Sequence, residues 1–319
     1  MAIHKTAQES DAIIKELRLK LGPKSKTMKD EYLIQFLVAR SWSVSGAKNQ
    51  IEKTLEWREK HKVNEHPVAT GENKLPLLYP IRGYNSIPDG NLEAAPGLSE
   101  SVLRINKYMG GSCLHKTDKN GCPIYIERLG YHAAKEIAKY TTVEEVSNYH
   151  IGCNEFLNRV IMEDCSRVAN KTINHETVIF DCTGMGWHQL HMPALHYLRA
   201  ISDADQNYYP ETLSRLFLVN APSSFVFVWK IVKAWLDPGT IDKIKILGSD
   251  YKEELLQYIP AENLPSFLGG ECTCAHMPGG CVPSQMLKNI PSLVPQSHNE
   301  KVSTPYNTDI MQKGTSYED

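Results

Sequence analysis

Two short apolar runs, each enclosed by segments with helical periodicity, limit the folds open to this chain more than any other feature. VIF at residues 178–180 and LFLV at residues 216–219 contain no polar side chain, which is typical of parallel strands covered on both faces. Further strands are expected at residues 123–127 and 244–247, and helices at about 142–166, at 189–205 and after Pro222. This alternation predicts an α/β domain with a mostly parallel sheet.

The segment before these strands reads as a small helical unit. Apolar residues recur at spacings of three and four over about residues 9–21, and Ser43 is placed to cap a helix that runs to about residue 61. The Gly- and Pro-rich stretch that follows breaks both periods. We therefore predict four regions, namely an N-terminal helical unit at 1–75, a linker or insertion at 76–103, the α/β domain at 104–275, and a largely disordered tail at 276–319.

The charge balance and the hydropathy pattern exclude several classes of protein. With 35 Lys and Arg against 37 Asp and Glu, the formal net charge is -2, so bulk attraction to nucleic acid is not expected. The N-terminus lacks the apolar core of a signal peptide, and the most apolar run, 225–236, is shorter than the roughly 18 residues that span a bilayer. We predict a monomeric cytoplasmic protein whose contact with membranes is peripheral and transient.

Signatures of α/β enzymes are missing from the strand ends. The sequence contains neither a G-x-x-x-x-G-K-[ST] phosphate loop nor a G-x-S-x-G nucleophile elbow, and GMGWHQ at 184–189 supplies two of the three glycines of a dinucleotide fingerprint. His188, His191 and His196 do not have the H-E-x-x-H arrangement of a metal site. We predict no enzymatic activity and no cofactor.

Four possible metal ligands lie close together near the C-terminal end of the predicted domain. They are Cys272, Cys274, His276 and Cys281, in the pattern C-x-C-x-H-x4-C. Zinc prefers these residue types, but the pattern lacks the paired spacings usual for zinc sites. The alternative is free thiols in a flexible tail. The spacing favours this alternative, so no metal site is predicted.

The segment after the second apolar run is itself very apolar. Between Pro222 and Asp237, hydrophobic side chains cover almost the whole circumference of the predicted helix, with Lys230 and Lys233 on one side. One interpretation is a core helix packed on both sides. The other is a helix that covers an apolar cavity with one face and meets lipid with another, with its tryptophans and lysines at the level of the headgroups.

Residues 30–272 contain five long motifs, in the order FLVARSWSVSGAK, LHKTDKNGCPIYIERLG, QNYYPETLSRLFLVNAP, WLDPGTIDKIKILGS and IPAENLPSFLGG. Together they resemble the CRAL-TRIO lipid-binding family, and in particular the fungal phosphatidylinositol/phosphatidylcholine transfer proteins of the secretory pathway. The resemblance implies an N-terminal helical cap, a sheet that floors a lipid pocket, and a mobile gate helix after NAP. The implied gate residues are Phe225, Phe227, Trp229, Val232 and Trp235.

The resemblance also implies where a phosphatidylinositol headgroup binds. The corresponding positions are Arg40, Asp118, Glu211, Thr240 and Lys243. Their chemical types are suitable, because a phosphodiester taken from water needs cationic or hydroxyl donors. Thr240 and Lys243 are expected near the start of a short helix opened by Asp237, where free N–H groups favour phosphate. Family members often have a lysine directly after the arginine, and Ser41 stands there in this chain.

The positions that bind phosphatidylcholine in close family members differ here. Only Tyr125 is retained, and the other positions hold Leu114, Asn154, Glu176, Val178 and Thr212. Such a pocket suits a sterol or another less polar molecule better than a choline headgroup. We therefore predict a phosphatidylinositol transfer or presentation protein with a second hydrophobic ligand. The alternative is a carrier of another hydrophobic ligand, such as a sterol or haem, with a weakened phosphoinositide site.

Overall fold

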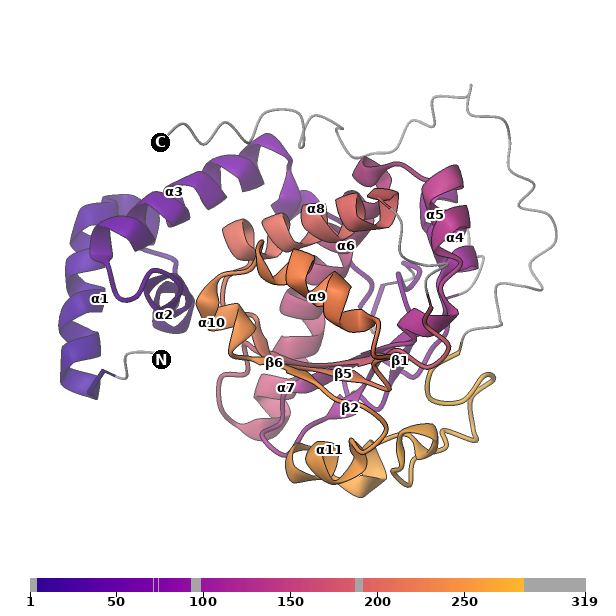
Figure 1. Ribbon diagram of the computed structural model, residues 1–319. Helices are drawn as coiled ribbons and strands as arrows, with labels where there is room; N and C mark the ends of the chain where they lie inside the picture. The colour runs from indigo at the N-terminus through magenta and orange to yellow at the C-terminus, as the bar shows by residue number, and fades with distance from the viewer. Residues whose placement is uncertain (1–4, 71, 74, 93–98, 187–191, 284–319) are drawn as a thin grey trace.

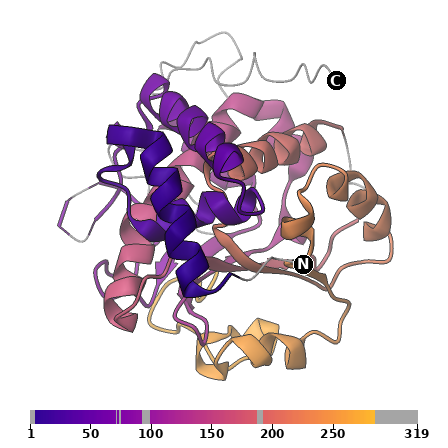
Figure 2. The ribbon, with the colours of Figure 1, turned by 90° about the vertical axis from the view of Figure 1, so that its left-hand side faces the viewer.

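The computed structural model describes residues 5–70, 72–73, 75–92, 99–186 and 192–283. Its centre is a six-stranded sheet, with a layer of helices above it in Figure 1 and a smaller layer below. The helices α1 (Ala7–Leu21), α2 (Asp30–Ala39) and α3 (Val44–Lys60) form a unit at one side of the sheet, and Figure 2 views the molecule from that side. The predicted α/β class is confirmed.

The N-terminal unit is held by local caps and a small core of its own. Thr6 and Glu9 form a capping box at the start of α1, and the Ser43 hydroxyl accepts a backbone N–H at the start of α3. The apolar faces of the three helices meet in a buried cluster. The helices expected from the sequence are present, and Arg40 lies at the C-terminal end of α2.

The strands lie side by side in the order in which they occur in the chain. Neighbouring strands are parallel, except that β2 and β3 are antiparallel. Their bounds are β1 Ile81–Arg82, β2 Ser112–Thr117, β3 Pro123–Glu127, β4 Glu176–Asp181, β5 Leu213–Val219 and β6 Ile244–Ile246. The predicted strands correspond to β3 to β6. The stretch 76–103, predicted as a linker or insertion, contains the edge strand β1.

The crossovers explain why the connecting helices lie on one face of the sheet. From β3 to β6 the chain always moves to the next strand in the same direction, and right-handed crossovers then put every helix on the same side. These helices are α5 Ala134–Tyr140, α6 Val143–Phe156, α7 Met162–Ala169, α8 Met192–Tyr208, α9 Phe225–Lys233 and α10 Pro238–Ile241, with α4 Glu100–Tyr108 beside them (Figure 1). A π-helical turn, Leu157–Ile161, joins α6 to α7.

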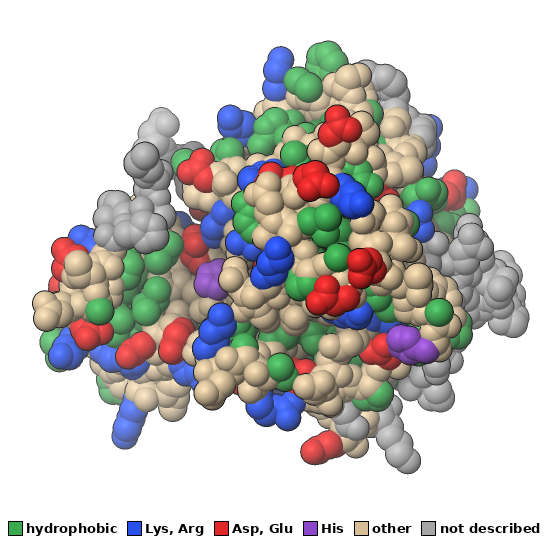
Figure 3. Space-filling model, turned by 90° about the horizontal axis from the view of Figure 1, so that it is seen from below, with side chains coloured by type: hydrophobic (Ala, Val, Ile, Leu, Met, Phe, Trp, Pro, Cys, Tyr) green, Lys and Arg blue, Asp and Glu red, His purple; other side chains and the backbone are tan. Residues whose placement is uncertain are grey.

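The other face of the sheet is covered by the last described part of the chain. There α11 (Lys252–Tyr258) and the residues after it pack against Ile126, Ile179 and Phe217. Figure 3 shows the outside of this layer, where acidic and basic side chains are interspersed. Cys281 and Val282 are buried within it. The tail at 276–319, predicted to be largely disordered, therefore begins with an ordered stretch up to residue 283, and residues 284–319 lie outside the described ones.

Candidate functional site

The floor of the candidate site is the helix-covered face of the sheet. One row of residues crosses all six strands, because each residue in the row is the Cα partner of the next. The row consists of Ile81, Leu114, Tyr125, Val178, Leu216 and Ile244. Leu114, Tyr125 and Val178, which were predicted for the second ligand, are therefore direct neighbours on three strands.

Several apolar side chains between the sheet and α9 are less buried than those on the other face. Phe180, Leu216 and Ile244, on the three strands beneath α9, are only partly buried. In contrast, Ile179 and Phe217, on the opposite face of β4 and β5, are fully buried. Protein interiors leave few voids larger than a water molecule. Partly exposed apolar side chains beneath a covering helix therefore indicate space for an apolar ligand.

The helix α9 has one face on the sheet and one face in solvent. Phe225 and Val228 are buried against the sheet, whereas Val226, Phe227 and Ile231 are 56%, 60% and 44% exposed. The interpretation of this segment as a core helix packed on both sides is therefore wrong. Within the described ranges, no helix has both the length and the apolar character needed to cross a bilayer.

The remaining predicted gate residues lie at two places. Trp229 and Val232 are partly buried on the packed side of α9, and Trp235 lies just after the helix ends. Trp229 also lines a small apolar hollow between the start of α9 and the end of β6, together with Pro222 and Ile246. This hollow lies at the carboxyl ends of β5 and β6.

The connection between α9 and α10 is fastened to α8 by one side chain. Gln206 donates from Nε2 to the Trp235 carbonyl at 3.1 Å, and its Oε1 accepts the Asp237 N–H at 2.7 Å. Gln206 thus holds the chain on both sides of residue 236.

Four of the five residues predicted for the inositol headgroup gather at the amino ends of β5 and β6. The Lys243 ammonium donates to Glu211 Oε2 at 2.7 Å, and their side chains are 23% and 19% exposed. The Thr240 carbonyl accepts the Lys243 N–H at 3.1 Å. Arg40, from the N-terminal unit, approaches Asp237 at the start of α10 to 3.9 Å. Two cations and two carboxylates therefore form ion pairs in this region, and the backbone of Thr240 is bonded to Lys243.

The short helix α10 does not support the argument from the helix dipole. It is a single turn that ends at Ile241, so Lys243 lies beyond its C-terminal end rather than near its start. That part of the prediction is wrong, and a phosphate here would depend on side chains. Glu211 has a φ of 59°, in the left-handed region that residues other than glycine rarely adopt. Backbone strain of this kind concentrates at functional sites.

Asp118, the fifth predicted headgroup residue, has a buried and fully engaged carboxylate. One oxygen accepts the N–H groups of Asn120 and Cys122 at 2.8 and 3.0 Å. The other accepts the Thr177 hydroxyl at 2.8 Å and the Arg215 guanidinium at 3.1 Å. Four hydrogen bonds fill the acceptor capacity of a carboxylate. Asp118 thus ties the β2–β3 turn to β4 and β5, and its contact with a headgroup stays a prediction.

A second polar cluster lies between the sheet and the helices α6 and α8. His150 Nε2 is 2.7 Å from Asp205 Oδ1, and Asn154 Nδ2 donates to the same oxygen at 3.1 Å. At the start of β4, burial raises the pKa of Glu176 to about 8, and Asp205 adds to the rise while His150 opposes it. Burial works to lower the pKa of His150, but the nearby Asp205 outweighs it and the pKa is raised.

Two other predicted pocket residues have their hydroxyl groups engaged within the protein. The Tyr125 hydroxyl donates to Glu127 Oε2 at 3.1 Å, and Tyr125 Cα is paired with Leu114 and Val178 on the neighbouring strands. The buried Thr212 hydroxyl donates to a backbone carbonyl at 2.9 Å. Both hydroxyl protons are therefore already used in hydrogen bonds within the protein, and neither is free to bind a phosphate.

The sequence did not point to three members of these clusters, His150, Asp205 and His175. His150 precedes Asn154 by one helical turn, and that spacing was an available signal. Asp205 comes from a different helix, and no local pattern indicates it. Burial and the charge of Lys243 lower the pKa of His175, and the charge of Glu211 opposes this shift.

In the part of the chain that the structure describes, no group of candidate metal ligands lies at this site. His196 lies on α8, and His188 and His191 lie outside the described residues. Within the described ranges, one group of residues has suitable ligand atoms close together, and it contains the three C-terminal cysteines. That group lies on the opposite face of the sheet.

Comparison with known protein families gives one matching domain. Residues 107–270 match the family described as CRAL/TRIO domain. The match covers just over half of the chain and includes β2 to β6, α9 and α10. A crystal structure of Sfh5 aligns with 78% of this chain and 84% of its own, with a TM-score of 0.52 and 15% identity. That likeness shows the fold alone.

Fungal and plant proteins are similar in sequence. The chain is 33% identical over 274 residues to the SEC14 cytosolic factor of Eremothecium gossypii, covering 85% of this chain and 80% of that protein. It is 31% identical over 272 residues to the Sec14 cytosolic factor of Schizosaccharomyces pombe, with coverages of 85% and 84%. It is 45% identical over 168 residues to the phosphatidylinositol/phosphatidylcholine transfer protein SFH11 of Arabidopsis thaliana, covering 53% of this chain. The chain spans less than half the length of the Arabidopsis relatives it matches, 44% in the case of SFH11.

Proposed function

The chain belongs to the CRAL/TRIO domain family, and from this premise we propose that it is a phosphatidylinositol transfer or presentation protein. It takes one phospholipid from a membrane, holds the acyl chains between the sheet and α9, and releases the lipid at another membrane. No covalent bond is made or broken. The names of the relatives support the proposal, because SFH11 is described as a transfer protein for phosphatidylinositol and phosphatidylcholine.

One observation carries the proposal. The partly exposed apolar side chains beneath α9 lie between two different features. The Lys243–Glu211 pair is at the amino ends of the strands, and the apolar hollow is at their carboxyl ends. The strand β5 between them has 7 residues and spans about 20 Å at about 3.3 Å per residue. A phospholipid has the same polarity, with a charged headgroup at one end and apolar tails at the other.

The polar cluster supplies the selectivity that acyl chains cannot. Each buried CH₂ contributes about 0.8 kcal/mol, whichever headgroup the lipid has. The Lys243–Glu211 pair keeps a cation and a carboxylate in place before the lipid arrives, so that one can donate to phosphate while the other accepts inositol hydroxyls. The Arg40 guanidinium comes no closer than 3.9 Å to the exposed Asp237. Because this contact is long, most of the Arg40 donors can turn to the phosphate.

The second ligand that we propose is less polar than phosphatidylcholine. A quaternary ammonium binds best within an aromatic cage, but the cross-strand neighbours of Tyr125 are the aliphatic Leu114 and Val178. Glu176 does not replace the missing rings, because a carboxyl with a pKa of about 8 is mostly neutral at pH 7. An aliphatic floor with one neutral carboxyl suits a sterol-like molecule with a single hydroxyl. This observation also favours the alternative function, a carrier of such a ligand alone.

Mass spectrometry of the lipids retained by the protein purified from eukaryotic cells separates the two functions. Phosphatidylinositol should be enriched in the extract relative to its share of the cell lipids. An extract that holds a sterol or another apolar molecule and no phosphatidylinositol would contradict the proposal and support the alternative.

Transfer of labelled phosphatidylinositol between vesicles tests the headgroup cluster. Hydrogen bonds to charged groups contribute about 1.5–3 kcal/mol, so Lys243→Ala should slow transfer at least about tenfold. Lys245→Ala is the matched control, because Lys245 lies two residues further along the chain, on β6, but bonds the Tyr258 hydroxyl of α11 at 3.3 Å. Unchanged transfer by a folded Lys243→Ala protein would refute the assignment of this cluster.

A further inference from the structure

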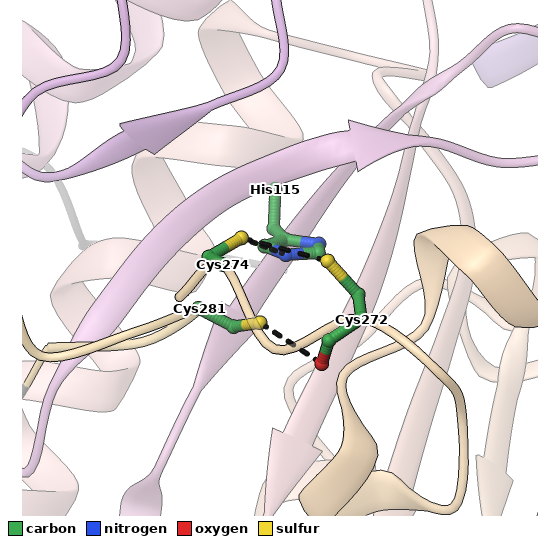
Figure 4. Close-up of side chains that lie close together, drawn as sticks. All are labelled: His115, Cys272, Cys274 and Cys281. Atoms are coloured by element: carbon green, nitrogen blue, oxygen red, sulfur yellow. Dashed lines mark hydrogen bonds between the residues drawn. The ribbon is translucent and has the colours of Figure 1, made fainter. Parts of the chain in front are cut away.

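On the face of the sheet opposite the lipid site, four side chains with metal-binding chemistry meet (Figure 4). They are His115, from β2, and Cys272, Cys274 and Cys281, from the last described part of the chain. We call them the Cys3His cluster. Their exposed fractions are 0%, 8%, 5% and 5%. This burial excludes the interpretation of the cysteines as free thiols in a flexible tail.

The spacing of the ligand atoms fits one tetrahedral ion. Cys272 Sγ is 3.5 Å from Cys274 Sγ, which is 3.4 Å from His115 Nε2. All four ligand atoms lie within 4.8 Å of one another. Zinc bonds of about 2.3 Å to sulfur and about 2.0 Å to nitrogen place tetrahedral ligand atoms about 3.5–3.8 Å apart. Two of the observed separations are close to these values, and rotation of the cysteine side chains can shorten the rest.

Neither a disulfide nor ordinary packing accounts for this arrangement. The sulfur atoms of Cys272 and Cys274 are 3.5 Å apart, far from the roughly 2.05 Å of a disulfide bond. Within the described residues, His115 Nδ1 has no hydrogen-bond partner, and Nε2 faces a thiol. A thiol is a weak hydrogen-bonding group, and a buried polar ring without strong partners is costly. A metal ion at the centre would satisfy Nε2.

The local sequence pattern pointed to the wrong histidine. His276 lies between the cysteines in sequence, but its side chain is 63% exposed and its Nε2 is 2.7 Å from Asp89 Oδ2. The fourth member of the cluster is His115, which the sheet brings to the cysteines from far upstream. The three cysteines thus need a ligand from β2 to complete a set of four.

We propose that the Cys3His cluster binds a single zinc ion in a closed structural site. Thiolates with an imidazole are a ligand set that zinc prefers, and four protein ligands leave no open position for a substrate. The three thiols release their protons to solvent as the ion binds. The filled site carries one net negative charge. Arg82, the Cα partner of His115 on β1, places positive charge beside it and donates to the Gly280 carbonyl at 3.1 Å.

The ion would fasten the C-terminal cover of the sheet to β2. The crossover helices all lie on the other face, so the segment that carries the cysteines protects Ile179 and Phe217 from solvent. Adjacent residues of β2 serve both faces, since Leu114 belongs to the floor of the lipid site and His115 to the Cys3His cluster. The zinc site therefore stabilises the strand that floors the ligand space.

Metal analysis of the full chain tests this proposal without any lipid assay. Protein purified under reducing conditions from zinc-supplemented cells should contain about one zinc per chain, and cobalt in its place should show the visible bands of tetrahedral thiolate coordination. Protein that binds no zinc even after addition of zinc in vitro would overturn the proposal. Bound iron instead of zinc, or a disulfide among the three cysteines shown by the loss of two hydrogens in the intact mass, would overturn it as well.

Variants locate the ion. Cys274→Ser and His115→Ala each remove one ligand and should weaken zinc binding at least about 100-fold, because changes to outer partners alone cost about 10–100-fold. Cys165→Ser alters a buried cysteine on α7 and should keep full zinc content. Equal zinc affinity in all three would overturn the proposal. Should the ligand variants fail to fold, chelation of the wild-type protein should lower Tm and added zinc should restore it, and a Tm insensitive to both would refute the site.

Discussion

Replacement of Glu176 by glutamine should remove a loss of folding stability that the wild type shows as the pH rises towards neutrality. The Glu176 carboxyl is partly buried, and within the described residues its side chain forms no hydrogen bond or ion pair. Burial raises its pKa to about 8, the Asp205 charge adds to the rise and His150 opposes it. In the unfolded chain the pKa of a glutamate is about 4.3. Between these two pKa values, the folded state holds a proton that the unfolded state has lost.

The sign and the size of the effect follow from proton linkage. A folded state that binds more protons than the unfolded state loses stability as the pH rises, by up to about 1.4 kcal/mol per pH unit for one group. From pH 5 to pH 7.5 this contribution amounts to about 3 kcal/mol. Glu176→Gln keeps the shape and polarity of the neutral carboxyl but cannot ionise. The stability difference between the variant and the wild type should therefore grow by about 3 kcal/mol in favour of the variant from pH 5 to pH 7.5.

Urea unfolding, followed by circular dichroism at several pH values between about 5 and about 7.5, measures this difference in stability. Glu253→Gln, at an exposed position on α11, is the control, and its difference from the wild type should stay constant across the range. Parallel pH profiles for Glu176→Gln and the wild type would refute the reasoning, since they would mean that Glu176 has the same protonation state in the folded and unfolded chains.

Three further predictions concern the packing of the helices and the helix α9. Glu155→Ala should destabilise the protein by about 3–5 kcal/mol in urea unfolding. The reason is that Arg58 donates to both oxygens of the buried Glu155 at 2.9 and 2.8 Å, and the Tyr209 hydroxyl donates to one of them at 2.8 Å. A loss of stability below about 1 kcal/mol, which is typical of a surface ion pair, would contradict this prediction. Phe227→Asp should weaken vesicle binding in a flotation assay with little change in stability, since this side chain is 60% exposed and a charge placed where lipid is met is costly. Amides of α9 should also exchange hydrogen faster with vesicles present, and equal protection with and without vesicles would count against a gate.

The sequence pattern predicted most of the parallel sheet, and the reason is local. The buried strands β4 and β5 are apolar on both faces, and the helices between them show their own period. The edge strand β1 has only two residues, and one of them is the fully buried Arg82. Arg82 donates to its neighbour, the Ile81 carbonyl, and to carbonyl and amide oxygens of Gly90, Asn91 and Gly280. A buried cation with distant backbone partners leaves no periodic signal in the sequence.

The candidate sites likewise combine residues that local sequence patterns indicate with residues that only the packing of distant segments brings together. The resemblance named Lys243 and Glu211 through motifs, and the structure pairs their side chains at 2.7 Å. His150 was accessible in principle through its helical spacing from Asn154, whereas Asp205 is brought to both only by the packing of α8 on α6. Local spacing does not predict the Cys3His cluster, because its fourth member comes from β2.

Transfer of phosphatidylinositol and phosphatidylcholine, measured in parallel between the same vesicles, tests the central claim most directly. Each ring of a choline cage contributes about 0.5–2 kcal/mol, and the row around Tyr125 offers Leu114 and Val178 in place of further rings. The account predicts transfer of phosphatidylinositol at least about tenfold faster than transfer of phosphatidylcholine. Comparable rates for the two lipids, or no transfer of phosphatidylinositol by the folded protein, would contradict it.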